Sequence, residues 1–111
     1  MAAIERQGQR YEINEMGFLC HWQAWDAEIA AHFAAEESIT LQEAHWQVID
    51  TLRNHFQEYG IAPMIRMLCN SLQRKYGPEA FDRTTLHHLF PGDLAKQACR
   101  IAGLPNSIGC V

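Results

Sequence analysis

Residues 40–77 read TLQEAHWQVIDTLRNHFQEYGIAPMIRMLCNSLQRKYG, and this stretch decides the fold. Thr40 and Glu43 have the T-x-x-E spacing of a capping box, in which each side chain satisfies a backbone N–H at the other position. Apolar residues then recur at helical spacing, which predicts an amphipathic helix that ends at Gly60. Its buried stripe is expected to consist of Val48, Ile49, Leu52, Phe56 and Tyr59.

A second helix is predicted directly after this one. Pro63 suits its first turn, Gly77 and Pro78 stop it, and its buried face consists of Ile65, Leu68, Leu72 and Tyr76. Two helices joined by a short turn form a helix-turn-helix-like pair. They indicate either two packed bundle helices or a DNA-binding motif with basic and amide side chains on its second helix, namely Arg66, Asn70, Gln73, Arg74 and Lys75.

The flanking segments complete a mainly α, single-domain chain. Residues 4–19 alternate apolar and polar side chains between turn signals, which predicts a small β-hairpin. Trp25, Ile29 and Phe33 are spaced for one face of a first helix. A short helix is expected over 83–89, and a last one follows a cap at Asp93 and ends at Gly103. We therefore expect a hairpin (4–19), an orthogonal helical core (20–103) and a flexible C-terminal arm (104–111).

The composition excludes several classes of protein. The chain has 111 residues, of which 48% are hydrophobic and 20% charged, and its net charge is −4. An acidic balance argues against a nucleic-acid backbone as the main partner. The first ten residues lack the apolar stretch of a signal peptide, and no apolar run approaches the length of a membrane span. We expect a cytoplasmic protein without membrane insertion, whose four cysteines are thiols.

Two of these cysteines lie near the C-terminus. Cys110 is the penultimate residue, where a thiol has little to pack against, and Gly109 beside it leaves access for a partner. Cys99 lies eleven positions earlier, so the tail can close a loop between the two sulfur atoms. Such a link constrains the chain by about 3 kcal/mol, the scale of a reversible bond. The tail is therefore a candidate for redox or sulfur-transfer chemistry.

Positive charge near Cys99 favours its thiolate, the nucleophilic form. Lys96 and Arg100 flank Cys99 on the last predicted helix. Cys20 and Cys69 are interpreted as structural. The cysteine spacings match no zinc site, and no phosphate loop, nucleophile–base pair or paired carboxylates are visible, so we expect no metal and no cofactor.

The motifs together are similar to those of the DsrC/TusE family, also described as the gamma subunit of dissimilatory sulfite reductase. The resemblance covers nearly the whole chain. Its central part comprises residues 40–46 (TLQEAHW), 59–63 (YGIAP) and Arg66. Its C-terminal part, the more specific one, comprises residues 89–91 (LFP), 96–100 (KQACR), 102–105 (AGLP) and 109–110 (GC).

This resemblance implies a sulfur carrier of dissimilatory sulfur metabolism. Cys110 would carry sulfur as a persulfide or trisulfide, and Cys99, present only in the DsrC type, would be the resolving thiol. Arg66 and Lys96 would bind the arm or favour its anionic sulfur, as Arg100 would, and Gly103 and Gly109 would make the arm flexible. The protein would be a co-substrate and not an enzyme in its own right.

The implied partners are sulfur donors and acceptors: sulfite reductase, DsrEFH- or TusBCD-like sulfurtransferases, or a heterodisulfide-reductase-like or membrane redox complex. The chain departs from the family pattern at Asp93 and at Asn106-Ser107-Ile108, which lower the positive charge near the tail. A specialised paralogue therefore stays open. So do two alternatives: a TusE-like relay toward tRNA 2-thiouridine, and a redox-sensing helix-turn-helix regulator.

Overall fold

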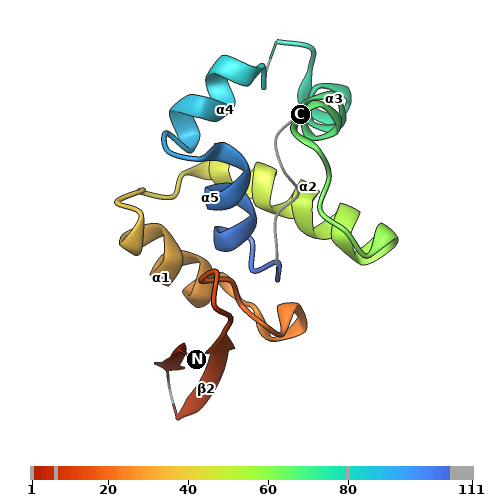
Figure 1. Cartoon of the computed structure of the whole chain (residues 1–111). Coiled ribbons are helices and arrows are strands. Elements are labelled where there is room, and N and C mark those ends of the chain that lie inside the picture. Colours follow the sequence, from red (N-terminus) through yellow and green to blue (C-terminus); the bar gives the residue numbers. More distant parts are fainter. Residues whose placement is uncertain (1, 7, 80, 106–111) are drawn as a thin grey trace.

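The computed structural model describes residues 2–6, 8–79 and 81–105. A two-stranded hairpin lies at one end of the molecule, and α3 and α4 lie at the other, with α5 between them (Figure 1). The fold is mainly helical with a small N-terminal sheet, as predicted. In chain order the elements are β1 (Ala2–Arg6), β2 (Gln9–Ile13), the 3-10 turn η1 (Trp22–Ala24), α1 (Ala27–Glu36), α2 (Glu43–Tyr59), α3 (Ile65–Tyr76), α4 (Arg83–Leu89) and α5 (Leu94–Ile101).

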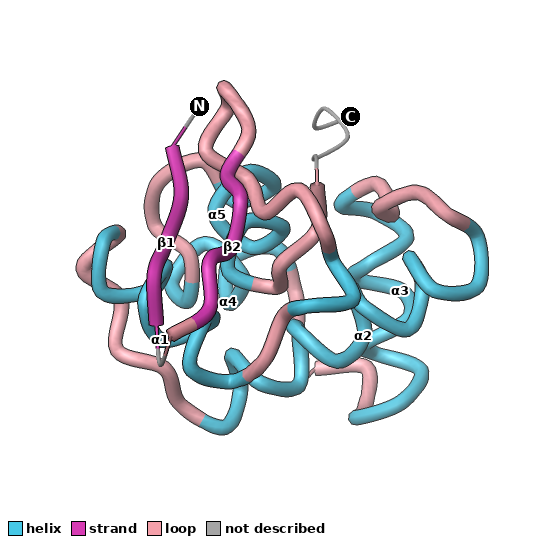
Figure 2. The backbone as a smooth tube through the Cα atoms, turned by 90° about the horizontal axis from the view of Figure 1, so that it is seen from below, coloured by secondary structure: helices cyan, strands magenta, loops and turns pink. Residues whose placement is uncertain are grey.

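The hairpin forms where the alternating pattern predicts it. Strands β1 and β2 pair antiparallel from Ala2 opposite Ile13 to Arg6 opposite Gln9 (Figure 2). A single bridge from Ile13 to Leu19 continues the pairing after the next turn. Asn14 holds that turn, because its Oδ1 accepts hydrogen bonds from the backbone N–H groups of Met16 and Phe18, both at 3.0 Å.

The starts of α1 and α2 differ from the sequence prediction. Helix α1 begins at Ala27 because the Asp26 carboxylate caps it, accepting from the Ile29 N–H at 3.0 Å, so Trp25 lies outside the helix. Helix α2 begins at Glu43, and its N-cap is Gln42 and not Thr40. There His45 Nδ1 accepts from the Gln42 N–H at 3.0 Å, which does the work predicted for the Thr40–Glu43 pair.

Apart from the start of α3, the other boundaries follow the predicted signals. Gly60 ends α2 in the left-handed conformation with φ of 76°. Helix α4 spans Arg83–Leu89, within the expected range. Asp93 caps α5 by accepting from the Lys96 N–H at 3.2 Å. Helix α3 begins at Ile65, so Pro63 lies just before its first turn and not within it.

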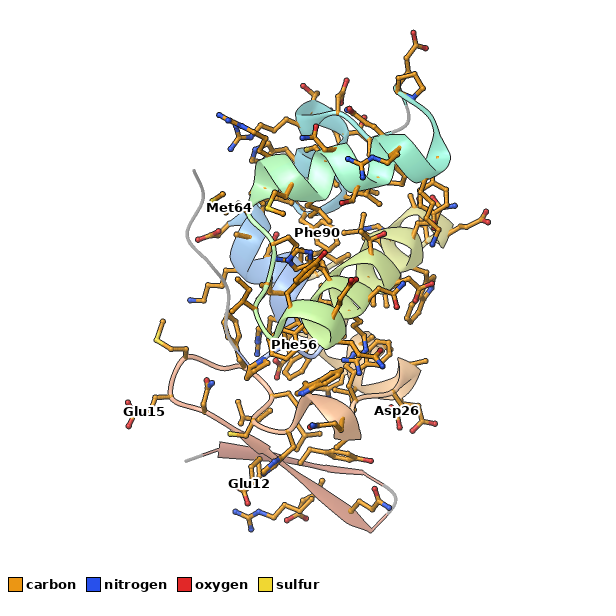
Figure 3. The ribbon with its side chains drawn as sticks, turned by 90° about the vertical axis from the view of Figure 1, so that its right-hand side faces the viewer. Glu12, Glu15, Asp26, Phe56, Met64 and Phe90 are labelled. Atoms are coloured by element: carbon orange, nitrogen blue, oxygen red, sulfur yellow. The ribbon has the colours of Figure 1, made fainter. Side chains whose placement is uncertain are left out.

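One hydrophobic core joins all these elements, from Ile4 and Ile13 of the hairpin to Leu104 beyond the last helix. Helix α5 packs against both α1 and α2. Phe90, at the end of α4, is fully buried and points in among the helices (Figure 3). Within the ranges that the structure describes, no helix combines the length and the apolar character needed to cross a bilayer.

Arg100 ties α5 to α1 and to the hairpin. Its Nη1 donates to Glu37 at 2.8 Å, its Nη2 donates to Glu36, and its Nε donates to the carbonyl of Gly17 at 2.9 Å. Gln97 adds a second link, because its Nε2 donates to the other oxygen of Glu37 at 3.0 Å. The guanidinium thus binds partners on two separate elements with its fixed fork of donors.

We predict that Arg100→Met lowers the free energy of unfolding by about 2 kcal/mol, because it removes charge-assisted hydrogen bonds and leaves carboxylates without their cation. Urea unfolding followed by circular dichroism measures this loss. Arg74→Met, at an exposed position of α3, is the matched control and should cost little. Equal losses in the two variants would contradict this account of α5.

Candidate functional site: the root of the C-terminal arm

Cys110, Gly109 and the departing segment Asn106-Ser107-Ile108 lie outside the described residues. The described part of the candidate site is therefore residues 99–105, which we call the arm root. It comprises the last turn of α5 and the chain that leaves it. Its geometry determines the place from which the rest of the arm starts.

Cys99 lies on the buried face of α5. Its side chain is 3% exposed, and its neighbours Ala98 and Ile101 are equally buried. Bulk reagents therefore have little access to this thiol in the structure. Cys20 and Cys69 are both half-buried, and burial raises the pKa of the Cys69 thiol, which disfavours its thiolate. The described residues contain no group of three or more His, Cys, Asp or Glu that could hold a metal ion.

The arm root turns back on α5 through a C-terminal capping motif. The Gly103 N–H donates to the Arg100 carbonyl at 3.1 Å, and the Leu104 N–H donates to the Cys99 carbonyl at 3.0 Å. These two bonds are the Schellman pattern, with Gly103 in the required left-handed conformation at φ of 78°. Leu104 is completely buried, so the packed body extends into the segment predicted as arm.

Side chains from three distant segments bind the carbonyl groups of the arm root. Trp25 Nε1 donates to the Ile101 carbonyl at 2.9 Å, and Arg53 Nη1 donates to the Ala102 carbonyl at 2.8 Å. Asn14 Nδ2 donates to the Pro105 carbonyl at 2.9 Å. The last carbonyls of a helix have no partner within it, so these donors satisfy groups that would otherwise need water. The path of the backbone through Pro105 is thereby fixed.

Arg53, on α2, makes the most extensive of these contacts. Its Nη2 donates to the Trp22 carbonyl at 2.9 Å, while its guanidinium lies 4.2 Å from the centre of the Trp25 ring. A cation over an indole face is attracted by the ring quadrupole. Burial lowers the pKa of Arg53, and Asp50 opposes that shift.

Gly103 is needed here for space as well as for conformation. A Cβ atom at Gly103 would lie 2.1 Å from Cδ1 of Trp25, well inside van der Waals contact. The indole therefore covers the turn closely and donates to the carbonyl two residues earlier. This packing gives Gly103 a positional role next to the flexibility expected of it.

The predicted cations occupy different places. Lys96 lies on α5, one turn before Cys99, and is exposed, whereas Arg66 is exposed on α3. Arg100 is next to Cys99 in sequence, but its three guanidinium nitrogens donate to Gly17, Glu36 and Glu37. The structure thus uses Arg100 to hold α5 in place.

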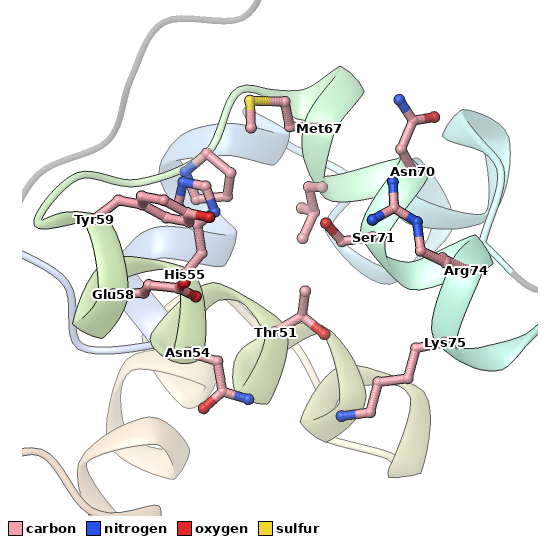
Figure 4. Close-up of a pocket in the computed structure, with 12 residues that line it drawn as sticks. Thr51, Asn54, His55, Glu58, Tyr59, Met67, Asn70, Ser71, Arg74 and Lys75 are labelled. Atoms are coloured by element: carbon pink, nitrogen blue, oxygen red, sulfur yellow. The ribbon is translucent and has the colours of Figure 1, made fainter.

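A groove of about 380 Å³ separates α2 from α3. Thr51, Asn54 and Glu58 face it from α2, and Arg74 and Lys75 face it from α3 (Figure 4). The helix-turn-helix-like pair therefore presents a mixed surface, in which a carboxylate shares the groove with two cations.

Sequence reasoning missed the residues that hold the arm root. The sequence marks Trp25 only as one of the apolar residues on a face of the first predicted helix. It marks Asn14 only as a residue of a turn in the hairpin region. Arg53 carried none, because it looks like an ordinary solvated residue of α2. Each of these contacts joins segments at least 49 positions apart, and no local pattern records such pairs.

We predict that Gly103→Ala destabilises the protein more than Gly60→Ala does. Both glycines end a helix at nearly the same positive φ, but a Cβ at Gly60 meets nothing within 4 Å. The shared backbone cost is about 1–2 kcal/mol, and overlap with Trp25 adds about 1–3 kcal/mol at Gly103 alone. Urea unfolding of both variants gives the difference. Equal losses would contradict the close packing of Trp25.

The chain matches known proteins along nearly its whole length. The family model described as "DsrC like protein" matches residues 5–111. The chain is 41% identical to "Sulfurtransferase TusE" of Photorhabdus laumondii over 111 residues, covering 100% of both chains. The oxidised gamma subunit of dissimilatory sulfite reductase (DsrC) from Archaeoglobus fulgidus superposes with a TM-score of 0.87 at 39% identity, covering 99% of this chain and 100% of the other. DsrC of Allochromatium vinosum gives the same TM-score and identity, with 98% and 97% covered. The chain therefore belongs to the DsrC-like family of sulfur-carrier proteins.

Proposed function

We propose that this protein carries sulfane sulfur on Cys110 and that Cys99 resolves the loaded form. The observation that carries the proposal is the pair of thiols at the two ends of the arm: one penultimate in the sequence, the other buried at the arm root. The similarity to proteins named sulfurtransferase and sulfite reductase gamma subunit supports it. In this proposal the protein is a cytoplasmic co-substrate that partner proteins load and reset.

Loading transfers one sulfur atom without net oxidation or reduction. The Cys110 thiolate attacks the terminal sulfur of a donor persulfide, a new S–S bond forms on Cys110, and the donor leaves as its thiolate. The exposed cations Lys96 and Arg66 are proposed to favour the anionic sulfur. Gly109 leaves the approach to Cys110 unobstructed by a side chain.

Resolution then uses the second thiol. The Cys99 thiolate attacks the Cys110 sulfur of the persulfide, so the Cys99–Cys110 disulfide forms and hydrosulfide leaves with the electron pair. A partner that supplies two electrons returns both cysteines to thiols. The chain length allows this step, because the five residue steps from Pro105 to Cys110 span at most about 17 Å, and the arm root turns back beside Cys99.

We predict that Cys110→Ala abolishes loading. After exposure to a persulfide donor, intact-protein mass spectrometry should show one added sulfur atom (about 32 Da) on Cys110 in the wild type and none in the variant. Cys99→Ala should load normally and keep the persulfide longer, because no internal thiol attacks it. Cys69→Ala, which changes a half-buried thiol outside the arm, is the control. Unchanged loading in Cys110→Ala would overturn the proposal.

A second candidate function is a relay of sulfur toward tRNA 2-thiouridine, and the names of the curated relatives favour it. The two candidates differ in what they require of Cys99, because a simple relay needs only Cys110. We predict that deleting the gene leaves 2-thiouridine in tRNA unchanged, as measured by nucleoside mass spectrometry. If the deletion strain loses 2-thiouridine and a gene encoding the Cys99→Ala variant restores it fully, the result favours the relay over the two-thiol carrier.

A further inference from the structure

We propose that Arg53 is a positioning residue of the sulfur-carrying arm: together with Trp25, it fixes the point from which Cys110 reaches Cys99. The inference rests on the proposed function and extends it, because it names a residue outside the arm that governs the resolving step. Arg53 acts through the backbone of the arm root, because its guanidinium donates to the Ala102 carbonyl.

The first support is the pair of carbonyls that Arg53 joins. Its Nη1 holds the Ala102 carbonyl at 2.8 Å, and its Nη2 holds the Trp22 carbonyl at 2.9 Å. One carbonyl belongs to the end of α5 and the other to η1, so the guanidinium links two segments that are distant in sequence. A planar fork of donors makes two such bonds at once, whereas a lysine ammonium is a single point of charge.

The second support is that side chains hold two further carbonyls of the arm root, those of Ile101 and Pro105. Trp25, which lies under the Arg53 guanidinium, donates to the Ile101 carbonyl. Asn14 donates to the Pro105 carbonyl, and Asn14 is itself fixed because its Oδ1 accepts two backbone N–H groups. Because Trp25 also packs on Gly103, a change at Arg53 or Trp25 removes contacts that hold the turn.

A fixed arm root shortens the loop that must close. The chain takes eleven residue steps from Cys99 to Cys110, but only five from Pro105 to Cys110. The entropic cost of closure grows with the logarithm of loop length, so halving the length favours closure about threefold. The hydrogen bonds that hold residues 101–105 therefore raise the effective concentration of Cys110 at Cys99 by about that factor.

The test measures closure directly. Purified full-length protein is equilibrated with reduced and oxidised glutathione, so that two cysteine thiols and one glutathione disulfide exchange with the Cys99–Cys110 disulfide and two glutathione thiols. Acid quenching, alkylation and peptide mass spectrometry give the equilibrium constant. We expect Arg53→Met to lower it by up to about threefold, the limit for a fully released root, Arg53→Lys to lower it less, and the exposed control Arg74→Met to match the wild type.

Two further measurements separate positioning from plain stability. Thermal unfolding shows whether a variant is folded, and a purely structural Arg53 would lower the midpoint but leave the closure constant of the folded protein unchanged. Trp25→Phe keeps a ring over Gly103 but removes the donor to Ile101, so it decides the matter if Arg53→Met does not fold. Closure constants equal to the wild type in every folded variant would overturn the inference.

Loading and closure measured in the wild-type protein separate a failure of this inference from a failure of the proposed function. A wild type that loads sulfur on Cys110 but never forms the Cys99–Cys110 disulfide removes the resolving role of Cys99, and the inference falls with it. A wild type that closes normally while Arg53→Met closes equally well refutes the inference alone.

Discussion

The hydrogen bond from Arg53 to the Ala102 carbonyl lies where α5 ends and the arm begins, and the candidate site depends on it. A helix end exposes carbonyls that must find donors. Here Trp25 and Arg53 supply them, and the capping bonds of Gly103 and Leu104 bend the chain back toward Cys99. The body of the protein therefore reaches through Leu104, and the arm starts from a fixed point.

Helix α5 carries both the buried thiol and the links that hold the helix. Cys99 points into the core, while the next residue, Arg100, donates to Glu36, Glu37 and Gly17. The ion pairs dock α5 on α1, so Cys99 lies on a helix that side chains of another element hold in place. In the function proposed above, Cys110 would react with a thiol that this scaffold holds in place.

Local patterns predicted most of the fold, and long-range contacts decided the rest. The Gly60 cap, the Asp93 cap and the helix over 83–89 each follow from neighbouring residues, and the structure has them. The start of α2 was misplaced because His45 competes with the Thr40–Glu43 pair as a capping side chain, and tertiary packing buries it. The two arm cysteines were visible in sequence because of their position. Arg53, Trp25 and Asn14 were not, since their partners in the arm root lie 49 or more positions away.

Backbone amide relaxation by NMR measures whether the arm root is rigid. If it is, Gly103 and Leu104 have order parameters equal to those of α5, about 0.85. The Leu104 amide, which donates to the Cys99 carbonyl, is also expected to exchange slowly with deuterium. Order parameters below about 0.6 at these two residues, with fast exchange at Leu104, would show that the arm root is not held by these contacts.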